Sequence, residues 1–418
     1  MCGTAHAEFI KSKIALIHAI SYPDYPVILK GSDVLPLGGV PINRIGVLTV
    51  QDNQLKPITF QIDAKDKNNQ YIFDKDDNEL TKPFGDNDEI VFLARDASKA
   101  WWEGEPPQEK GSFITEIEFE DPVSGELRWV YVVSYSKSSE VKKTATDNIH
   151  YNQATDAIWS ETYRIGFIEE IPFLVDMFHW STPDKNCCPD IIDSMKIRHT
   201  GKLFGLFDFE RTHRDYDSKI VAIKDGPVRV IRRTSNTVHV IFGYHSPEIL
   251  IDFIAYQKAI FMDMHINLPF RLGLILSDLK TYTTVDQDNN PLLPASYIFS
   301  ESMLEGSEIN GEMDEADRNL NNSGDSWLAL NSEYGSLLAG LAIEPRMPVT
   351  KQVYIADDLT IKDPPEEIEG LFGNVGYMTE GWEDVSGGIY HMLFGIYVAE
   401  KTDPKKSFEI LIDAPWPM

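Results

Sequence analysis

Histidine and arginine side chains that could transfer protons lie in the second half of the chain. His213, His245 and His265 fall between residues 213 and 265, close in sequence to Arg229. Imidazole changes charge near neutral pH and arginine can face it as a fixed cation, so these four residues are the candidate catalytic set of an acid–base enzyme. Side chains alternate along a strand, so Arg229 and Arg232 would point to opposite faces. The competing interpretation is a set of ion pairs and solvated strand positions.

Acidic residues in the first half could hold calcium. Asp74, Asp76 and Asn78 supply oxygens at the first, third and fifth positions of a calcium-binding loop. The sixth position is not glycine and the twelfth is not glutamate, so the motif is incomplete. A second acidic run, at 286–290, fails in the same way. We therefore expect solvated hairpin turns and assign no metal or cofactor, with calcium as the alternative.

Two adjacent tryptophans form the candidate binding surface. Trp101 and Trp102 follow a strand-like run and stand beside Glu103 and Glu105. Exposed indole rings stack on pyranose rings or anchor protein interfaces. The alternative is that one ring closes the end of a sandwich while the other is half exposed.

Recognisable catalytic motifs are missing from the sequence. It contains no G-x-S-x-G, no P-loop, no dinucleotide-binding fingerprint, no H-E-x-x-H and no C-x-x-C. Cys187 and Cys188 are adjacent, and two free thiols are a better interpretation than a strained vicinal disulfide. These absences favour a non-enzymatic role.

The charge balance restricts the possible partners. The chain has 38 basic and 66 acidic residues, a net charge of −28. This charge repels nucleic acid and anionic membrane and favours a basic protein partner or self-association. No apolar stretch is long enough to span a membrane. Ala5-His6-Ala7 resembles the end of a signal peptide whose upstream part is missing, so we expect a periplasmic or extracellular protein.

The elements that must position these residues are strands. In the first half, β-branched runs and period-two alternation predict about seven strands of a β-sandwich, among them 44–50, 57–63, 89–94, 113–119 and 128–135. Residues 136–148 are polar and form the best linker. Further strands at 219–223, 228–232, 237–242, 250–256 and 259–266, without intervening helices, predict antiparallel pairing. The segment 305–325 is rich in polar residues and is expected to be an exposed loop.

Two stretches resemble known domains. Pro57–Asp63 (PITFQID), followed by Asp86–Ala94 (DNDEIVFLA), resembles the N-terminal Ig-like β-sandwich of certain large bacterial exported proteins, mostly uncharacterised. Asp225–Val230 (DGPVRV) is similar to a turn found where such sandwiches precede a galactose-mutarotase-like β-supersandwich. The resemblance implies an all-β protein: an Ig-like antiparallel β-sandwich at residues 8–145, then a larger antiparallel β-supersandwich at 149–418. That superfold serves carbohydrate epimerases, polysaccharide lyases and glycosidase accessory domains.

Two functional hypotheses follow. The first is a non-enzymatic structural or assembly component of an exported bacterial complex, which docks a basic partner, such as a redox enzyme or multihaem cytochrome, through its acidic surface. The alternative is a carbohydrate-active or carbohydrate-binding protein that uses the supersandwich, by the resemblance and by Trp101 and Trp102.

Overall fold

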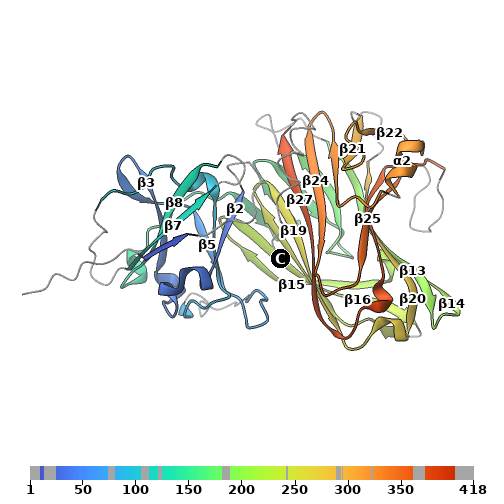
Figure 1. The fold of residues 1–418 in the computed structure, drawn as a ribbon, viewed down its shortest axis with the longest axis horizontal. Coiled ribbons are helices and arrows are strands. Elements are labelled where there is room, and N and C mark those ends of the chain that lie inside the picture. The colour runs from blue at the N-terminus through green and yellow to red at the C-terminus, as the bar shows by residue number, and fades with distance from the viewer. Residues whose placement is uncertain are drawn as a thin grey trace, which may run out of the picture. The chain divides into compact units, whose positions relative to one another are not determined.

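The computed structural model is an almost entirely antiparallel β protein, which confirms the all-β prediction. It describes residues 10–13, 25–73, 81–104, 113–120, 125–180, 189–241, 243–288, 293, 295–321, 323–360 and 372–400. These residues form two compact units (Figure 1). Unit 1 contains the described residues up to Asn148 together with Gly226–Arg229, and unit 2 contains those of 149–225 and from Val230 onward.

Unit 1 contains a five-stranded sheet and a three-stranded sheet. The five-stranded sheet, in spatial order, consists of β1 (Ile10–Lys13), β7 (Phe113–Glu120), β8 (Leu127–Ser134), β3 (Ile45–Gln51) and β4 (Gln54–Pro57). The three-stranded sheet consists of β2 (Pro26–Lys30), β6 (Glu89–Leu93) and β5 (Phe60–Asp63). Short 3-10 turns connect them, at η1 (Gly31–Leu37), η2 (Ile42–Arg44), η3 (Ala94–Asp96) and η4 (Ser138–Glu140). Among the pairings described, β1 with β7 is parallel.

Two sequence predictions for unit 1 have opposite outcomes. The predicted hairpin of 113–119 and 128–135 is confirmed as the antiparallel pair β7–β8. The single strand predicted at Pro57–Asp63 is wrong. Pro57 ends β4, the Ile58 N–H still donates to Val47 O beside it, and Phe60 begins β5 in the other sheet.

Unit 2 contains three sheets. The ten-stranded sheet runs β15 (Tyr216–Asp225), β16 (Arg229–Ile241), β18 (Ile249–Tyr256), β19 (Ala259–Leu268), β27 (Gly388–Glu400), β24 (Gly335–Ile343), β23 (Trp327–Asn331), β21 (Ser296–Ser300) and β22 (Ser307–Ile309), with β17 (Tyr244–His245) beside β16. A five-stranded sheet runs β14 (Phe207–Thr212), β13 (Ile192–Leu203), β20 (Leu276–Gln287), β26 (Asn374–Glu380) and β25 (Thr350–Ala356). A four-stranded sheet runs β12 (Val175–Trp180), β11 (Tyr163–Phe167), β10 (Ala157–Ser160) and β9 (Ile149–Asn152).

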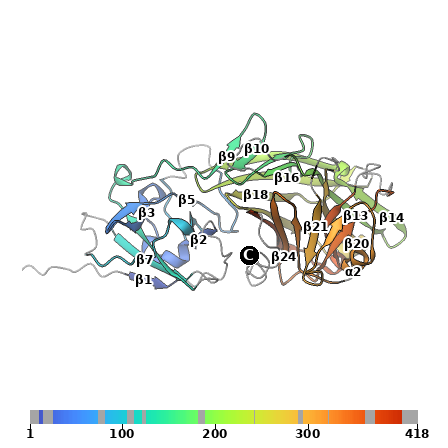
Figure 2. The ribbon, with the colours of Figure 1, turned by 90° about the horizontal axis from the view of Figure 1, so that it is seen from above.

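The β9–β10 hairpin lies beside β16 (Figure 2). Arg232 on β16 is fully buried, and its Nε donates to Asp156 Oδ1, in the β9–β10 turn, at 2.8 Å. Its guanidinium also stacks 4.0 Å from the ring of Phe167. This ion pair joins two of the sheets of unit 2 across their shared core.

The strands predicted at 250–256 and 259–266 are confirmed as the antiparallel pair β18–β19, with Ile251 opposite Met264 and Phe253 opposite Met262. The prediction of an exposed loop at 305–325 is wrong. That segment holds β22 and helix α2 (Glu315–Leu320), visible beside β22 in Figure 1. Asp314 caps the helix by accepting from the Asp317 N–H, and Asp317 and Leu320 are buried. The polar residues of this segment therefore cap the helix and form turns, and the segment is not an irregular loop throughout.

The larger sheets of unit 2 enclose an apolar cavity of about 200 Å³. Val238, Ile251, Met262 and Met392 line it from the ten-stranded sheet. Since side chains alternate along a strand, the odd-numbered residues of β15 before its bulge at 220–222, those of β16, β19 and β27, and the even-numbered residues of β18 face away from the cavity. We call this second side the outer face of the ten-stranded sheet.

Several predictions concern positions outside the described residues. These positions are the calcium candidates Asp74, Asp76 and Asn78 and the adjacent Cys187 and Cys188. Within the described part of the chain, no helix is long and apolar enough to cross a membrane.

Candidate functional site

The structure does not bring the four candidate catalytic residues together. His213 begins the short 3-10 turn η5 (His213–Asp215), His245 lies on β17 and His265 lies on β19. Arg229 belongs to unit 1 instead. The set predicted from sequence proximity is therefore spread over different elements: the three histidines lie on η5, β17 and β19, and Arg229 is buried in unit 1.

Arg229 is the centre of an ion network inside unit 1. It is fully buried, its Nε donates to Asp63 Oδ2 at 2.7 Å, and its Nη2 donates to Glu89 Oε2 at 2.7 Å. Lys65 pairs with the same Glu89, so two cations face two carboxylates. Gln61 Oε1 accepts from the Arg229 backbone N–H at 3.1 Å.

The tryptophan pair is divided between surface and core. Trp101 is 48% exposed, and its indole N–H donates to Glu116 at 2.7 Å. Trp102 is half-buried and packs against the core cluster that contains Tyr131. One open ring can stack on a ligand, whereas the two rings do not form a shared flat platform.

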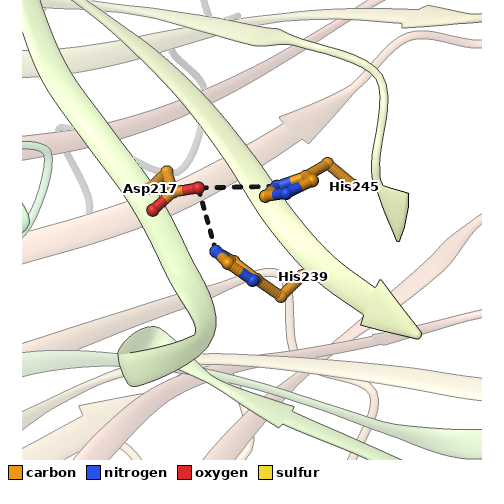
Figure 3. Close-up of side chains that lie close together, drawn as sticks. All are labelled: Asp217, His239 and His245. Carbon is orange, nitrogen blue, oxygen red and sulfur yellow. Dashed lines mark hydrogen bonds and ion pairs between the residues drawn. The ribbon is translucent and has the colours of Figure 1, made fainter. Parts of the chain in front are cut away.

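A first polar cluster, the sheet-edge triad, consists of Asp217, His239 and His245. Figure 3 shows both imidazole rings directed at one carboxylate. Asp217 Oδ2 lies 2.9 Å from His239 Nε2 and 3.4 Å from His245 Nδ1. All three residues are exposed on the outer face at the edge of the sheet. Their donor atoms lie within 4.8 Å of one another, which is a spacing suited to a metal ion.

A second cluster, the sheet-centre cluster, lies on the same face. Its five members come from four neighbouring strands: Arg233, Asp252, Asp263, His265 and His391. Asp252 stands opposite Asp263 in the β18–β19 register, and His265 stands opposite His391 in the β19–β27 register. Directly opposed positions hold side chains close enough to interact.

Three buried members of the sheet-centre cluster hold one another in place. Arg233 grips Asp252 with two hydrogen bonds of 2.6 Å. His265 Nε2 lies 3.2 Å from Asp252 and 3.5 Å from Asp263. Burial raises the pKa of Asp252, but the hydrogen bonds and charges of Arg233 and His265 outweigh it, so this pKa lies below its usual value.

The remaining two members are partly exposed to solvent. The side chains of Asp263 and His391 are 24% and 34% exposed, and His391 Nδ1 lies 3.6 Å from Asp263 Oδ1. The cluster therefore has a carboxylate and an imidazole that solvent can reach. The carboxylate of Asp263 contacts the buried His265, which in turn contacts Asp252 and, through it, Arg233. Such an arrangement can accept and return a proton while its rings stay fixed.

The apolar cavity between the sheets offers different chemistry. His199 is the histidine that lines it, and its ring nitrogens bond Thr281 Oγ1 at 2.9 Å and Tyr216 Oη at 2.7 Å. Burial lowers the pKa of His199 to about 4, so the ring is neutral at physiological pH. With an otherwise largely apolar lining, this cavity does not suit a polyhydroxylated ligand.

Comparisons with known proteins find likeness in structure alone. No protein-family profile matches the sequence, and no curated protein matches it. An alpha-mannosidase from Enterococcus faecalis V583 matches with a TM-score of 0.49 and 11% identity, over 95% of this chain and 44% of that one. A glycosyl hydrolase family 38 protein from Enterococcus faecalis matches with a TM-score of 0.46 and 12% identity, over 93% and 44%.

A beta-arabinopyranosidase matches with a TM-score of 0.29 and 7% identity, over 61% of this chain and 40% of that one. This chain thus spans less than half the length of these three proteins. The three are carbohydrate-active by their descriptions, and likeness at these scores assigns no activity to this chain.

Proposed function

We propose that this protein binds a carbohydrate and carries out acid–base chemistry on it at the sheet-centre cluster. The observation that supports the proposal is the pairing of the partly exposed Asp263 and His391 with the buried residues His265, Asp252 and Arg233. This proposal takes the carbohydrate hypothesis ahead of the docking hypothesis.

The chemistry of the cluster fits sugar hydroxyl groups. A carboxylate accepts hydrogen bonds from two neighbouring hydroxyls, and an imidazole can donate or accept. With the anomeric hydroxyl placed between Asp263 and His391, one group takes up the hydroxyl proton and the other protonates the ring oxygen, so that the C1–O5 bond breaks and the ring opens. The reverse proton transfers close the ring in the other configuration, as a 1-epimerase requires. Arg233 keeps Asp252 ionised, and the Asp252 carboxylate then orients His265.

Sugar binding tests the proposal. Replacing Asp263 by Asn or His391 by Gln should weaken binding of a neutral or acidic sugar by roughly tenfold or more, because each variant removes a hydrogen bond to a charged or ionisable group. Saturation-transfer NMR against a panel of hexoses, pentoses and uronic acids finds the ligand, and calorimetry gives the affinity.

Asp208→Asn is the matched control, since Asp208 is an exposed carboxylate on β14 that pairs with Lys202. This variant should bind as the wild type does. Binding that survives both Asp263→Asn and His391→Gln, or a complete lack of binding across the panel, would contradict the proposal.

A second candidate function is protein docking, supported by the net charge of −28 and by an exposed apolar turn. Phe204, Leu206 and Phe207, in and beside the β13–β14 turn, are 60%, 77% and 64% exposed. We expect a basic partner to be retained from periplasmic and membrane fractions at low salt and released at high salt. Leu206→Asp should weaken retention of the partner. Docking is contradicted if the amount of partner retained changes neither with salt nor with this substitution.

A further inference from the structure

We propose that the sheet-edge triad of Asp217, His239 and His245 is a binding site for a divalent transition-metal ion of the zinc class. This site lies outside the sheet-centre cluster, and the inference does not depend on the proposed carbohydrate function. It rests on the geometry of three donor atoms, on their chemistry and on the strands that hold them.

The strand register fixes the three side chains. His239 on β16 lies directly opposite His245 on β17. Asp217 on β15 is opposite Thr237, two residues before His239 and on the same face. The three donor atoms therefore come from three paired strands, β15, β16 and β17, and lie close together. The centroids of the two imidazole rings are 4.2 Å apart.

The spacing matches a tetrahedral coordination edge. Zinc binds imidazole nitrogen and carboxylate oxygen at about 2.0–2.2 Å, so two tetrahedral ligand atoms stand roughly 3.3–3.5 Å apart. The distances from Asp217 Oδ2 to the two histidine nitrogens are 2.9 and 3.4 Å. Small rotations of exposed side chains suffice to admit an ion.

The donor types select the metal class. Two imidazoles and one carboxylate suit zinc, cobalt and nickel, whereas calcium takes six to eight oxygens. Three protein ligands leave at least one position for water or for an external ligand atom. The acidic protein raises the local concentration of cations around such an exposed site.

The sheet-centre cluster is less suited to a cation, although Asp263, His265 and His391 also lie within 4.8 Å of one another. Arg233 already neutralises Asp252, and its fixed positive charge opposes a dication nearby. His265 Nε2 is shared between two carboxylates. In the sheet-edge triad, by contrast, both histidines turn to a single carboxylate oxygen.

A bound ion would also stabilise the edge of the ten-stranded sheet by linking β15 and β17 to β16. β15 is the edge strand, and β17 is a two-residue strand paired with β16. Coordination links both to β16 through side chains, so metal binding should protect the backbone amides of β17 from exchange and raise the melting temperature with metal concentration.

Cobalt titration of the full chain tests the inference. Co²⁺ in a site of low coordination number gives visible absorption bands, and Zn²⁺ added afterwards should displace it. We expect one site that His239→Gln, His245→Gln and Asp217→Asn each weaken by roughly tenfold or more. These side chains are exposed, so the variants should fold as the wild type does.

His391→Gln is the matched control, because it removes one histidine from the other cluster. It should leave cobalt affinity and zinc displacement unchanged. The inference is overturned if the wild type binds neither metal, if the three triad variants bind as tightly as the wild type, or if His391→Gln alone abolishes binding.

Discussion

Replacing Arg229 by methionine is expected to destabilise unit 1 by about 3–5 kcal/mol, because the change leaves buried carboxylates without their main cation. Asp63 and Arg229 are fully buried, and Glu89 is nearly so. Lys65 remains beside Glu89 but makes no described ion pair with Asp63. Asp63 would keep its hydrogen bonds from Gln61 but lose the charge of Arg229, and the loss of a counter-charge at a buried site is among the larger single costs in a folded protein.

Urea unfolding of the full chain, followed by tryptophan fluorescence, measures this loss. Lys56→Met is the matched control in unit 1, since Lys56 pairs with the exposed Asp52 at 2.6 Å. That variant should leave the unfolding curve unchanged, because exposed pairs contribute little. An Arg229→Met curve that overlays the Lys56→Met curve would show that the network adds no stability.

The same ion network makes the stability of unit 1 depend on pH. Burial raises the pKa of Glu89, but the charges of Arg229 and Lys65 outweigh it, so the folded-state pKa lies below the ordinary value of 4.5. The stabilisation is therefore complete above about pH 4.5 and is lost as the pH falls through the folded-state pKa. In Arg229→Met one opposing cation is missing, so the loss should begin at higher pH.

Replacing Asp252 by alanine is expected to destabilise unit 2 by about 3–5 kcal/mol, because Arg233 is left buried without its bidentate partner. His265 loses the carboxylate that fixes its ring in the same change. Thermal unfolding monitored by circular dichroism measures the effect, with urea titration as a second readout.

Asp263→Ala is the control from the same cluster and the opposite strand. Its side chain is 24% exposed and can be replaced by water, so the cost in stability should be below about 1 kcal/mol. Under the proposed function the two aspartates would have separate roles: Asp252 would support the fold and Asp263 would contact the ligand. Equal destabilisation by both substitutions would remove that distinction.

Strands could be predicted from the sequence where the two paired runs are neighbours along the chain. The β7–β8 and β18–β19 hairpins were predictable because each pairs neighbouring apolar, β-branched runs. The break at Pro57 was missed because alternation across it is uninterrupted, and only the change of sheet shows that the chain turns. α2 was missed because four of its six residues are polar and its cap resembles a turn.

The candidate sites depended on register that sequence does not reveal. His239 and His245 flank Gly243, whose positive φ of 80° marks a turn, so a glycine between two histidines is the local signal of their pairing. His391 lies far along the chain from His265 and reaches it only through the β19–β27 pairing. No local pattern predicts that contact. Arg229 was predicted to be catalytic because it lies close in sequence to the three histidines, whereas its partners Asp63 and Glu89 lie far upstream.

The discontinuity of unit 1 has a consequence for biosynthesis. Domains generally fold in the order in which they leave the ribosome. Gly226–Arg229 completes unit 1, although residues 149–225 of unit 2 are made before it. Until then the nascent chain carries Asp63 and Glu89 without Arg229. A fragment ending at Asn148 should therefore mature poorly, and adding a peptide that carries residues 226–229 is the natural route to rescue it.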